Sequence, residues 1–476
     1  MKRKVFFIIF GFAYLYFLVM FWWLRHVSVY APIFLSLPLA LFRTIAIYIP
    51  FLSSPLLRYR KLPFWVIGGM LIERLIIDSI YPQPYLSANQ IFTISPEFFS
   101  PALSLVTIYQ DILLFLISFF FYSIIRMFLF KRALLSLEKV NIFFVLLICG
   151  LCVINFFSNR KAKNFHRPVK QLRIAILQPN IAQEIKNEYR NLSNFIVDKI
   201  HYQISEVEKR KEKIDIIIGP ETIFPFVVKY KNKAYKYLKV LRRKLRSDLL
   251  IGGFWEDTKG NIFNSAFLIT KTTIQVYKKV RLVVFGEYLP LGNIEFVRKI
   301  YNIFLPTQHF EELKSAKKFR RFNYKGLKIQ VLICFEGFLE ESYKNTNVDL
   351  FINLSNEGWY KDGHELYWAW NITKAFSVFS QTPIIRSTNT GISGIHYPNN
   401  YSKLLHKEGK LINFEGVYID KVVLGEKSPG SLHSLCYSLI LVYILIFLIV
   451  AILYGVILLI IIIVIIIFRL LGRFRF

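Results

Sequence analysis

Apolar residues gather at the two ends of this 476-residue chain, and that distribution limits what the chain can fold into. Residues 5–157 and 432–471 are rich in Phe, Leu, Ile and Val, whereas the stretch between them has the composition of a soluble domain. About 20 apolar residues in a helix cross the ~30 Å hydrocarbon core of a bilayer. We therefore expect a multi-pass α-helical membrane region (1–157), a soluble domain (158–430) and a C-terminal membrane helix with a basic tail (431–476).

Six apolar segments are predicted to span a membrane: 5–24, 31–52, 63–80, 103–129, 140–157 and 435–468. Lys and Arg in short loops mark the cytoplasmic side. They cluster before the first span, after the second and after the fourth, whereas residues 81–102 contain none. Five spans before the soluble domain would then place it outside the cytoplasm.

The formal net charge of +30 fits an anionic membrane surface or nucleic acid. Many of the Lys and Arg residues flank apolar spans, and the sequence contains no zinc-finger, helix-turn-helix or aromatic RNA-binding pattern. We therefore expect a membrane protein without a nucleic-acid partner.

Alternating strand-like and helix-like runs fill the soluble domain and predict an α/β fold with sheets covered by helices. The expected strands are 172–179, 214–219, 248–254, 265–270, 328–334 and 349–354, and the expected helices are 182–210, 232–246 and a segment after Trp359.

Three motifs place a carboxylate, an ammonium and a thiol at or just after strand-like runs. They are Gly-Pro-Glu-Thr with Glu221, Tyr-Lys-Lys-Val-Arg with Lys279, and Leu-Ile-Cys-Phe-Glu with Cys334. Groups at strand ends can converge in one cleft. A base, a cation and a thiol are the minimum set for acyl transfer through a thioester. From composition alone, Lys278 could replace Lys279, and each of these groups could be an ordinary surface or capping residue.

Cysteine usage favours Cys334 as a nucleophile. It is the only cysteine of residues 158–430, so no disulfide partner exists within the domain. Cys149 and Cys152 lie in a predicted span, where packing is the expected role. No second histidine follows His364-Glu365 at metal-binding spacing, so we expect no metal site there. The domain contains several histidines, so a Cys–His pair is possible in principle, although none lies in a recognisable motif.

Together these motifs resemble those of the bacterial apolipoprotein N-acyltransferases, the membrane-anchored branch of the nitrilase superfamily. The resemblance extends to Ser355-Asn356-Glu357-Gly358-Trp359 and to the segment 386–392, and Glu73-Arg74 in the third span resembles a further family element. It implies an extracytoplasmic nitrilase-like αββα sandwich. It also implies a triad with Glu221 as general base, Cys334 as nucleophile and Lys279 as the cation that stabilises the oxyanion. The expected supporting residues are Glu287, Glu336, Phe335, Asn356 and Trp359.

The function implied is transfer of a fatty acyl chain from a phospholipid, through a thioester, to the α-amino group of a diacylglyceryl apolipoprotein. The resemblance also implies a multi-pass protein of the bacterial inner membrane with a periplasmic catalytic domain, and it implies no cofactor and no metal. A monomer is expected. The alternatives are a membrane-tethered amidase or acyl hydrolase and an inactive membrane scaffold.

Lipid contacts are expected in two places. One is Glu73 and Arg74, for which an intramembrane salt bridge is the alternative. The other is a flap at 289–305, whose apolar positions recur at helical spacing and for which packing on the core is the alternative. The candidate contacts in these two places are Glu73, Arg74, Ile294, Phe296, Ile300 and Phe304, and Arg386 is a further candidate elsewhere in the domain.

Overall fold

The structure, a computed structural model, describes residues 2–53, 168–210, 212–304, 313–344 and 347–425, with isolated positions between 117 and 153. Contacts divide the chain into two compact units, residues 1–96 with 159–428 and residues 97–158 with 429–476. The helices and strands named below belong to the first unit.

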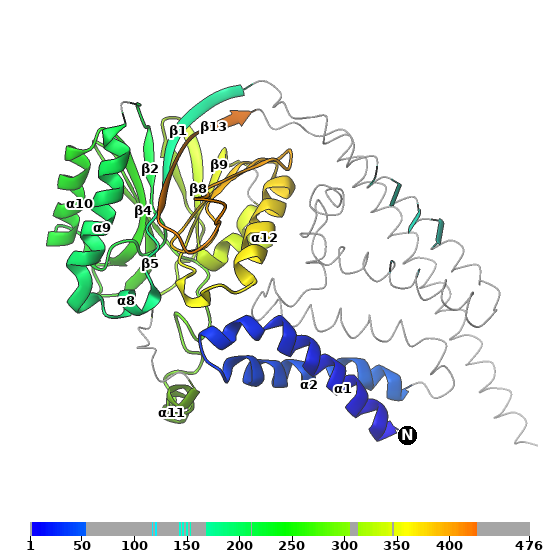
Figure 1. Ribbon diagram of the computed structural model, residues 1–476. Helices are drawn as coiled ribbons and strands as arrows, with labels where there is room; N and C mark the ends of the chain where they lie inside the picture. Colours follow the sequence, from blue (N-terminus) through cyan, green and yellow to red (C-terminus); the bar gives the residue numbers. More distant parts are fainter. Residues whose placement is uncertain are drawn as a thin grey trace, which may run out of the picture. The chain divides into compact units, whose positions relative to one another are not determined.

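Two sheets form the soluble domain (Figure 1). The first has the order β13-β1-β2-β4-β5-β6, with β3 beside β4. Strands β1, β2 and β4 run parallel, and β13, β5 and β6 continue the sheet with antiparallel pairings. Its strands are β1 (Pro168–Gln178), β2 (Ile216–Ile218), β3 (Val227–Lys229), β4 (Asp248–Glu256), β5 (Ile262–Ile269), β6 (Ile274–Lys278) and β13 (Gly416–Gly425).

The second sheet has the order β12-β11-β10-β9-β8-β7, and its central strands β8, β9 and β10 are parallel. Its strands are β7 (Arg321–Tyr324), β8 (Leu327–Ile333), β9 (Leu350–Ser355), β10 (Ile384–Thr388), β11 (Gly394–His396) and β12 (Ser402–Leu404).

Side-chain alternation along the strands explains the layers. In β2, Ile216 and Ile218 join the core between the sheets, whereas Ile217 packs under the outer helices. In β8, Val331 faces the inner core and Leu332 faces the outer side of the second sheet. Both faces of each sheet are therefore buried, which requires helices on the outside.

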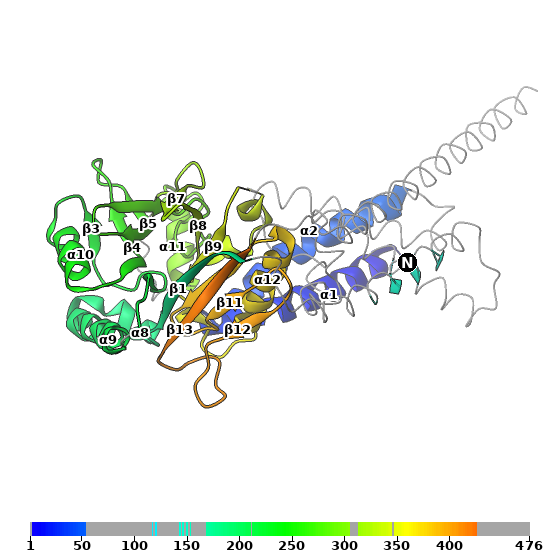
Figure 2. The ribbon, with the colours of Figure 1, turned by 90° about the horizontal axis from the view of Figure 1, so that it is seen from above.

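The outer layers are helical and complete an αββα sandwich, as expected (Figure 2). Helices α9 (Tyr189–Lys209) and α10 (Lys233–Lys244) cover the first sheet, and α12 (Glu365–Ser380) covers the second. The remaining elements near the site are α8 (Gln183–Asn187), α11 (Glu295–Phe304), η4 (Cys334–Phe338), η5 (Glu340–Tyr343) and η6 (Gly358–Tyr360).

All six strands expected in the soluble domain are confirmed, as β1, β2, β4, β5, β8 and β9. The helix expected over 182–210 is divided into α8 and α9 at Glu188, and those expected over 232–246 and after Trp359 are α10 and α12.

The apolar runs 5–24 and 31–52 contain α1 (Lys2–Met20), the short helix η1 (Trp22–His26) and α2 (Ala31–Ser53). Phe17 and Phe21 pack against Ala40, so α1 and α2 form a pair. Among the residues described, no helix is both long enough and apolar enough to cross a membrane. The runs predicted as spans at 63–80, 103–129, 140–157 and 435–468 lie outside the described residues, apart from isolated positions.

Candidate active site

Strand ends from both sheets meet at the site. Glu221 follows β2, and Lys279 is the first residue after β6. Cys334 follows β8, and Asn356 follows β9. Strands β8 and β9 are parallel, so Cys334 and Asn356 follow strand ends on the same side of the second sheet.

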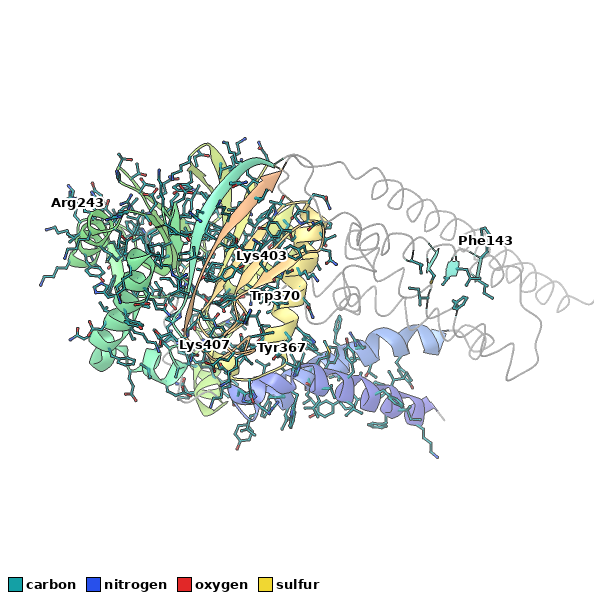
Figure 3. All side chains as sticks on the ribbon, turned by 45° about the horizontal axis from the view of Figure 1, so that its top comes forward. Phe143, Arg243, Tyr367, Trp370, Lys403 and Lys407 are labelled. Carbon is teal, nitrogen blue, oxygen red and sulfur yellow. The ribbon has the colours of Figure 1, made fainter. Side chains whose placement is uncertain are left out.

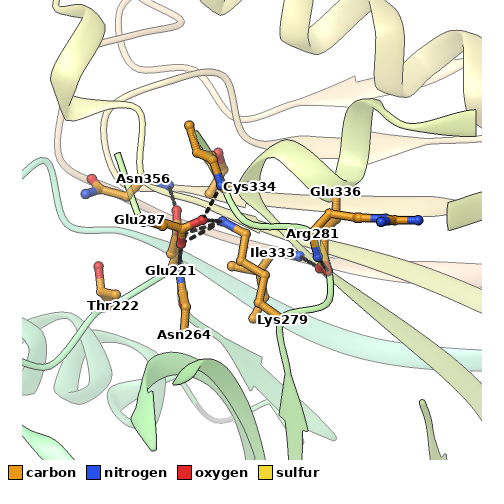
Figure 4. A network of polar contacts seen from close by, with 12 residues as sticks. Glu221, Thr222, Asn264, Lys279, Arg281, Glu287, Ile333, Cys334, Glu336 and Asn356 are labelled. Atoms are coloured by element: carbon orange, nitrogen blue, oxygen red, sulfur yellow. Dashed lines mark hydrogen bonds and ion pairs between the residues drawn. The ribbon is translucent and has the colours of Figure 1, made fainter. Parts of the chain in front are cut away.

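Lys279 forms the centre of a buried charge cluster (Figure 4). Its Nζ lies 2.9 Å from both carboxylate oxygens of Glu287 and 3.6 Å from Oε1 of Glu221. Burial alone would lower the pKa of the ammonium, but the two carboxylates outweigh it and hold the pKa well above its usual value. The site therefore keeps a permanent cation beside the thiol.

Glu221 is held at both carboxylate oxygens. Its Oε1 accepts a hydrogen bond from Asn264 Nδ2 at 2.7 Å, and its Oε2 accepts one from the backbone N–H of Asn356 at 2.8 Å. The β4 backbone passes so close to Glu221 that a Cβ on Gly252 would lie 2.6 Å from the Glu221 Cα. Only glycine allows this approach, which brings the backbone of β4 against that of Glu221.

Cys334 begins a tight turn at the end of β8. Its φ of 51° lies in the left-handed region, which residues other than glycine rarely adopt. Residues with such a backbone conformation cluster at functional sites. Burial raises the pKa of the thiol to about 12, with Glu221 adding to this effect and Lys279 opposing it. The resting side chain is therefore a thiol at neutral pH, and it needs a base to become a nucleophile.

Glu336 joins the nucleophile turn to the lysine loop. Its Oε2 accepts the N–H of Ile333 at 2.8 Å, and its Oε1 accepts the N–H groups of Val280 and Arg281 at 2.6 and 3.1 Å. The hydroxyl of Tyr277 donates to both oxygens at 2.9 Å. These bonds fix the backbone on either side of the pair formed by Cys334 and Lys279.

Glu336 should make stability depend on pH. Burial raises its pKa from 4.5 to about 7. Above pH 4.5 the unfolded state loses the proton of Glu336, whereas the folded state keeps it up to about pH 7. The contribution of Glu336 to the free energy of unfolding is therefore full below about pH 4.5 and is lost as the pH rises to about 7. The difference in free energy of unfolding between wild type and Glu336→Gln should fall across this window and stay constant above it.

Denaturant titrations in detergent at a series of pH values measure that difference. Glu408→Gln, in an exposed turn, is the matched control. A difference that rises across the window, or does not change, would contradict the assignment.

Two polar residues of the site had no motif to identify them. Asn264 in β5 contacts both Glu221 and Glu287. Lys186 in α8 donates from Nζ to the Thr222 hydroxyl at 3.0 Å, and burial lowers its pKa to about 8. The signal available for Asn264 was a single amide within the apolar run Ile262–Ile269, because a buried amide needs partners.

The expected supporting residues lie near this cluster. Glu287 accepts the N–H of Val283 at 2.8 Å as well as the bonds from Lys279 and Asn264. Phe335 packs with Phe338 beside α12. Lys278, the alternative cation, points away from the site, with its Nζ 3.9 Å from the centre of the Phe263 ring.

Asn356 also donates from Nδ2 to Gln183, and Trp359 lies on η6, partly exposed. On α12, Tyr367 is exposed, whereas Trp370 is buried against His396 (Figure 3).

The expected lipid contacts have different placements. Arg386 is fully buried in β10, where it pairs with Glu357 and donates to Asn353 Oδ1 at 2.7 Å. This placement gives it a structural role in the core in place of the expected lipid contact. Ile294 and Phe296 are exposed near the start of α11. Glu73 and Arg74 lie outside the described residues, as do the side chains of Ile300 and Phe304.

Residues 173–426, more than half of the chain, match the carbon-nitrogen hydrolase family. With the αββα sandwich and the half-buried Cys334 beside Glu221 and Lys279, this makes the protein an enzyme of the nitrilase superfamily with a cysteine-based mechanism. The chain belongs to the carbon-nitrogen hydrolase family.

Several relatives carry the name apolipoprotein N-acyltransferase. The protein from Aquifex aeolicus is 26% identical over 265 residues, which cover 55% of this chain and 57% of that protein. The protein from Helicobacter pylori is 27% identical over 302 residues, which cover 61% and 67%. The chain thus spans about half the length of the first curated relatives it matches.

Solved structures also align. Saccharomyces cerevisiae Nit3, a member of branch 10 of the nitrilase superfamily, is 14% identical, with a TM-score of 0.40. The alignment covers 57% of this chain and 96% of that one.

Proposed function

We propose that this protein is an apolipoprotein N-acyltransferase. One observation carries the proposal: the Cys334 thiol shares a buried site with Glu221 and Lys279, and the loop just beyond Glu287 exposes large apolar side chains. The names of the relatives support the same activity. The donor is a phospholipid, and the acceptor is the α-amino group of an N-terminal diacylglyceryl-cysteine.

In the first half-reaction, Glu221 accepts the thiol proton and the Cys334 sulfur attacks the ester carbonyl of the phospholipid. The developing oxyanion lies beside the Lys279 ammonium, whose charge is fixed by Glu287 and Glu221. The C–O bond then breaks, and Glu221 returns its proton to the leaving oxygen. The products are a thioester on Cys334 and a lysophospholipid.

In the second half-reaction, the α-amine attacks the thioester and loses a proton to Glu221. The C–S bond breaks, the sulfur regains the proton, and an amide forms on the lipoprotein. The two substrates use the same thiol in turn, which predicts ping-pong kinetics.

A membrane location is the second part of the proposal. Phe7 and Phe12 of α1 are 67% and 73% exposed, and Ile33, Phe34 and Leu37 of α2 are exposed as well. Large apolar surfaces of this kind are unfavourable in water and favourable against lipid. We place the protein in the bacterial inner membrane with residues 158–430 on the extracytoplasmic side.

Reporter fusions test this orientation. A fusion after Arg58 should give a cytoplasmic signal, and a fusion after Lys163 should give an extracytoplasmic one. The same signal at both positions would exclude an odd number of spans between them.

The exposed loop and α11 should deliver the lipid to the site. Leu291 and Phe296 are 67% and 69% exposed, whereas Tyr301 is buried and its hydroxyl donates to the Phe285 carbonyl at 2.7 Å. Leu291→Asp combined with Phe296→Asp should slow phospholipid-dependent acylation of Cys334 about tenfold or more, since each buried apolar side chain is worth ~1.5–3 kcal/mol.

The double variant should keep the wild-type unfolding midpoint, because both side chains are exposed. Phe195→Asp, also at an exposed position but on α9, is the matched control and should acylate normally. Acylation at the wild-type rate in the double variant would show that the loop takes no part in lipid delivery.

The function itself is tested by incubating the purified protein with mixed phospholipid vesicles. We expect one acyl chain to be added to Cys334, seen by peptide mass spectrometry, with an equal amount of lysophospholipid. Addition of a diacylglyceryl-cysteine peptide should then yield the triacylated peptide. Free fatty acid as the only product would identify an acyl hydrolase instead, and absence of both products would support an inactive scaffold.

A further inference from the structure

Asn264 contacts every charged residue of the catalytic cluster. It lies in β5 and is 3% exposed. Its Nδ2 donates to Glu221 Oε1 and to Glu287 Oε1, each at 2.7 Å, and its backbone carbonyl accepts the N–H of Lys279 at 2.8 Å. The residue is thus joined by hydrogen bonds to the proposed base, to its neighbouring carboxylate and to the residue that carries the cation (Figure 4).

The chemistry of a primary amide matches this position. The NH₂ group carries two hydrogens, so one can be donated to each carboxylate. The opposite orientation of the amide would direct Oδ1 at two anionic oxygens, so only the observed orientation is stable. No donor among the described residues reaches Oδ1, so the amide is held by its contacts with the two carboxylates.

The two carboxylates differ in how firmly their other contacts hold them. Lys279 neutralises one of the two formal negative charges, and its Nζ is nearer to Glu287 (2.9 Å) than to Glu221 (3.6 Å). Glu287 is held by Lys279 and the Val283 N–H. Within the part of the chain that the structure describes, the Glu221 carboxylate has the Asn356 N–H as its one other short hydrogen bond. Loss of Asn264 would therefore release Glu221 more than Glu287.

We propose that Asn264 is a positioning residue: its amide bridges Glu221 and Glu287 and so holds the Glu221 carboxylate where it can take the thiol proton of Cys334. The inference rests on the proposed role of Glu221 as the base. It does not depend on the identity of the acyl donor or acceptor.

A double-mutant cycle tests this on the full-length protein in detergent. The readout is the rate of alkylation of Cys334 by iodoacetamide at neutral pH, quantified at the Cys334 peptide. In this reaction the thiol loses its proton and the sulfur displaces iodide, so activation of the thiol is measured without a phospholipid.

Asn264→Ala should slow alkylation of Cys334 about tenfold to a hundredfold, as expected for a misplaced catalytic group. Glu221→Gln should slow it at least as much. The combination should be no slower than Glu221→Gln alone, because residues that act as a unit are not additive. Effects that multiply, or a wild-type rate in Asn264→Ala, would overturn the proposal.

Asn232→Ala is the matched control. Asn232 caps α10 by accepting the N–H of Tyr235 at 2.8 Å, so its loss lowers stability without touching the site. It should leave the alkylation rate unchanged. A slowing equal to that of Asn264→Ala would show that lower stability, rather than a misplaced base, explains the effect.

Asn264→Asp keeps the shape of the side chain if Asn264→Ala does not fold. The added carboxyl should move the midpoint of the alkylation-rate pH profile upward by about one unit or more. A midpoint equal to that of wild type would overturn the proposal.

Normal Glu221-dependent alkylation without any acylation by phospholipid would refute the proposed function and leave this inference intact.

Discussion

Replacing Cys334 with alanine is expected to abolish both the acyl adduct and all transfer to a lipopeptide. Among the described residues of the soluble domain it is the one thiol, and it lies within electrostatic reach of Glu221, Lys279 and Glu287. Serine at this position should be nearly as inactive, since a hydroxyl is a far weaker nucleophile than a thiol. Intact mass spectrometry and a lipopeptide turnover assay measure the two effects.

Cys149→Ala is the control, because Cys149 lies outside the soluble domain and should not affect either assay. Transfer near the wild-type rate in Cys334→Ala would exclude Cys334 as the nucleophile and, with it, the thioester mechanism.

Lys279→Ala is expected to have the second-largest effect. Loss of one oxyanion donor typically raises the barrier by ~3–4 kcal/mol, which corresponds to a rate loss of two to three orders of magnitude. The variant also leaves Glu221 and Glu287 in a buried site without their cation, so the protein should become less stable. Acylation rates must therefore be normalised to the folded fraction, and Lys279→Gln, which keeps most of the side-chain volume, should show the same kinetic loss.

The adjacent lysine provides the matched control. Lys278 is partly exposed, and its ammonium lies over the Phe263 ring rather than in the site. Lys278→Ala should change the acylation rate little. A large loss in Lys278→Ala with normal activity in Lys279→Ala would show that the cation had been assigned to the wrong residue.

The strands that the sequence predicted are mostly apolar. Ile216–Ile218 and Leu350–Ser355 are fully buried and read as continuous apolar runs. The strands that were missed have other patterns. β13 carries Asp420 and Lys421 at an edge of its sheet, β12 is Ser-Lys-Leu, and β10 contains the fully buried Arg386. The presence of a charged residue in a strand could be explained only once its partner was known. Asp420, for example, pairs with Lys403.

The site residues that directly follow a strand could be predicted from the sequence. Glu221, Lys279 and Cys334 each follow a strand, and that placement alone suggested that they converge. Contacts set by strand register could not be predicted. Asn264 reaches two carboxylates that are 43 and 23 residues away, and Arg386 finds its partner Glu357 29 residues upstream. Sequence spacing carries no information on such pairs.

A chase of the acyl-enzyme tests whether the thioester on Cys334 passes its acyl chain to the lipopeptide. The protein is loaded with an isotopically labelled phospholipid, freed of lipid, and mixed with a diacylglyceryl-cysteine peptide while the Cys334 adduct is followed by mass spectrometry. If Cys334 carries the transferred acyl chain, the label should leave Cys334 and appear on the peptide's α-amine at the same rate. Label that stays on Cys334, or that passes only to water as free fatty acid, would contradict it.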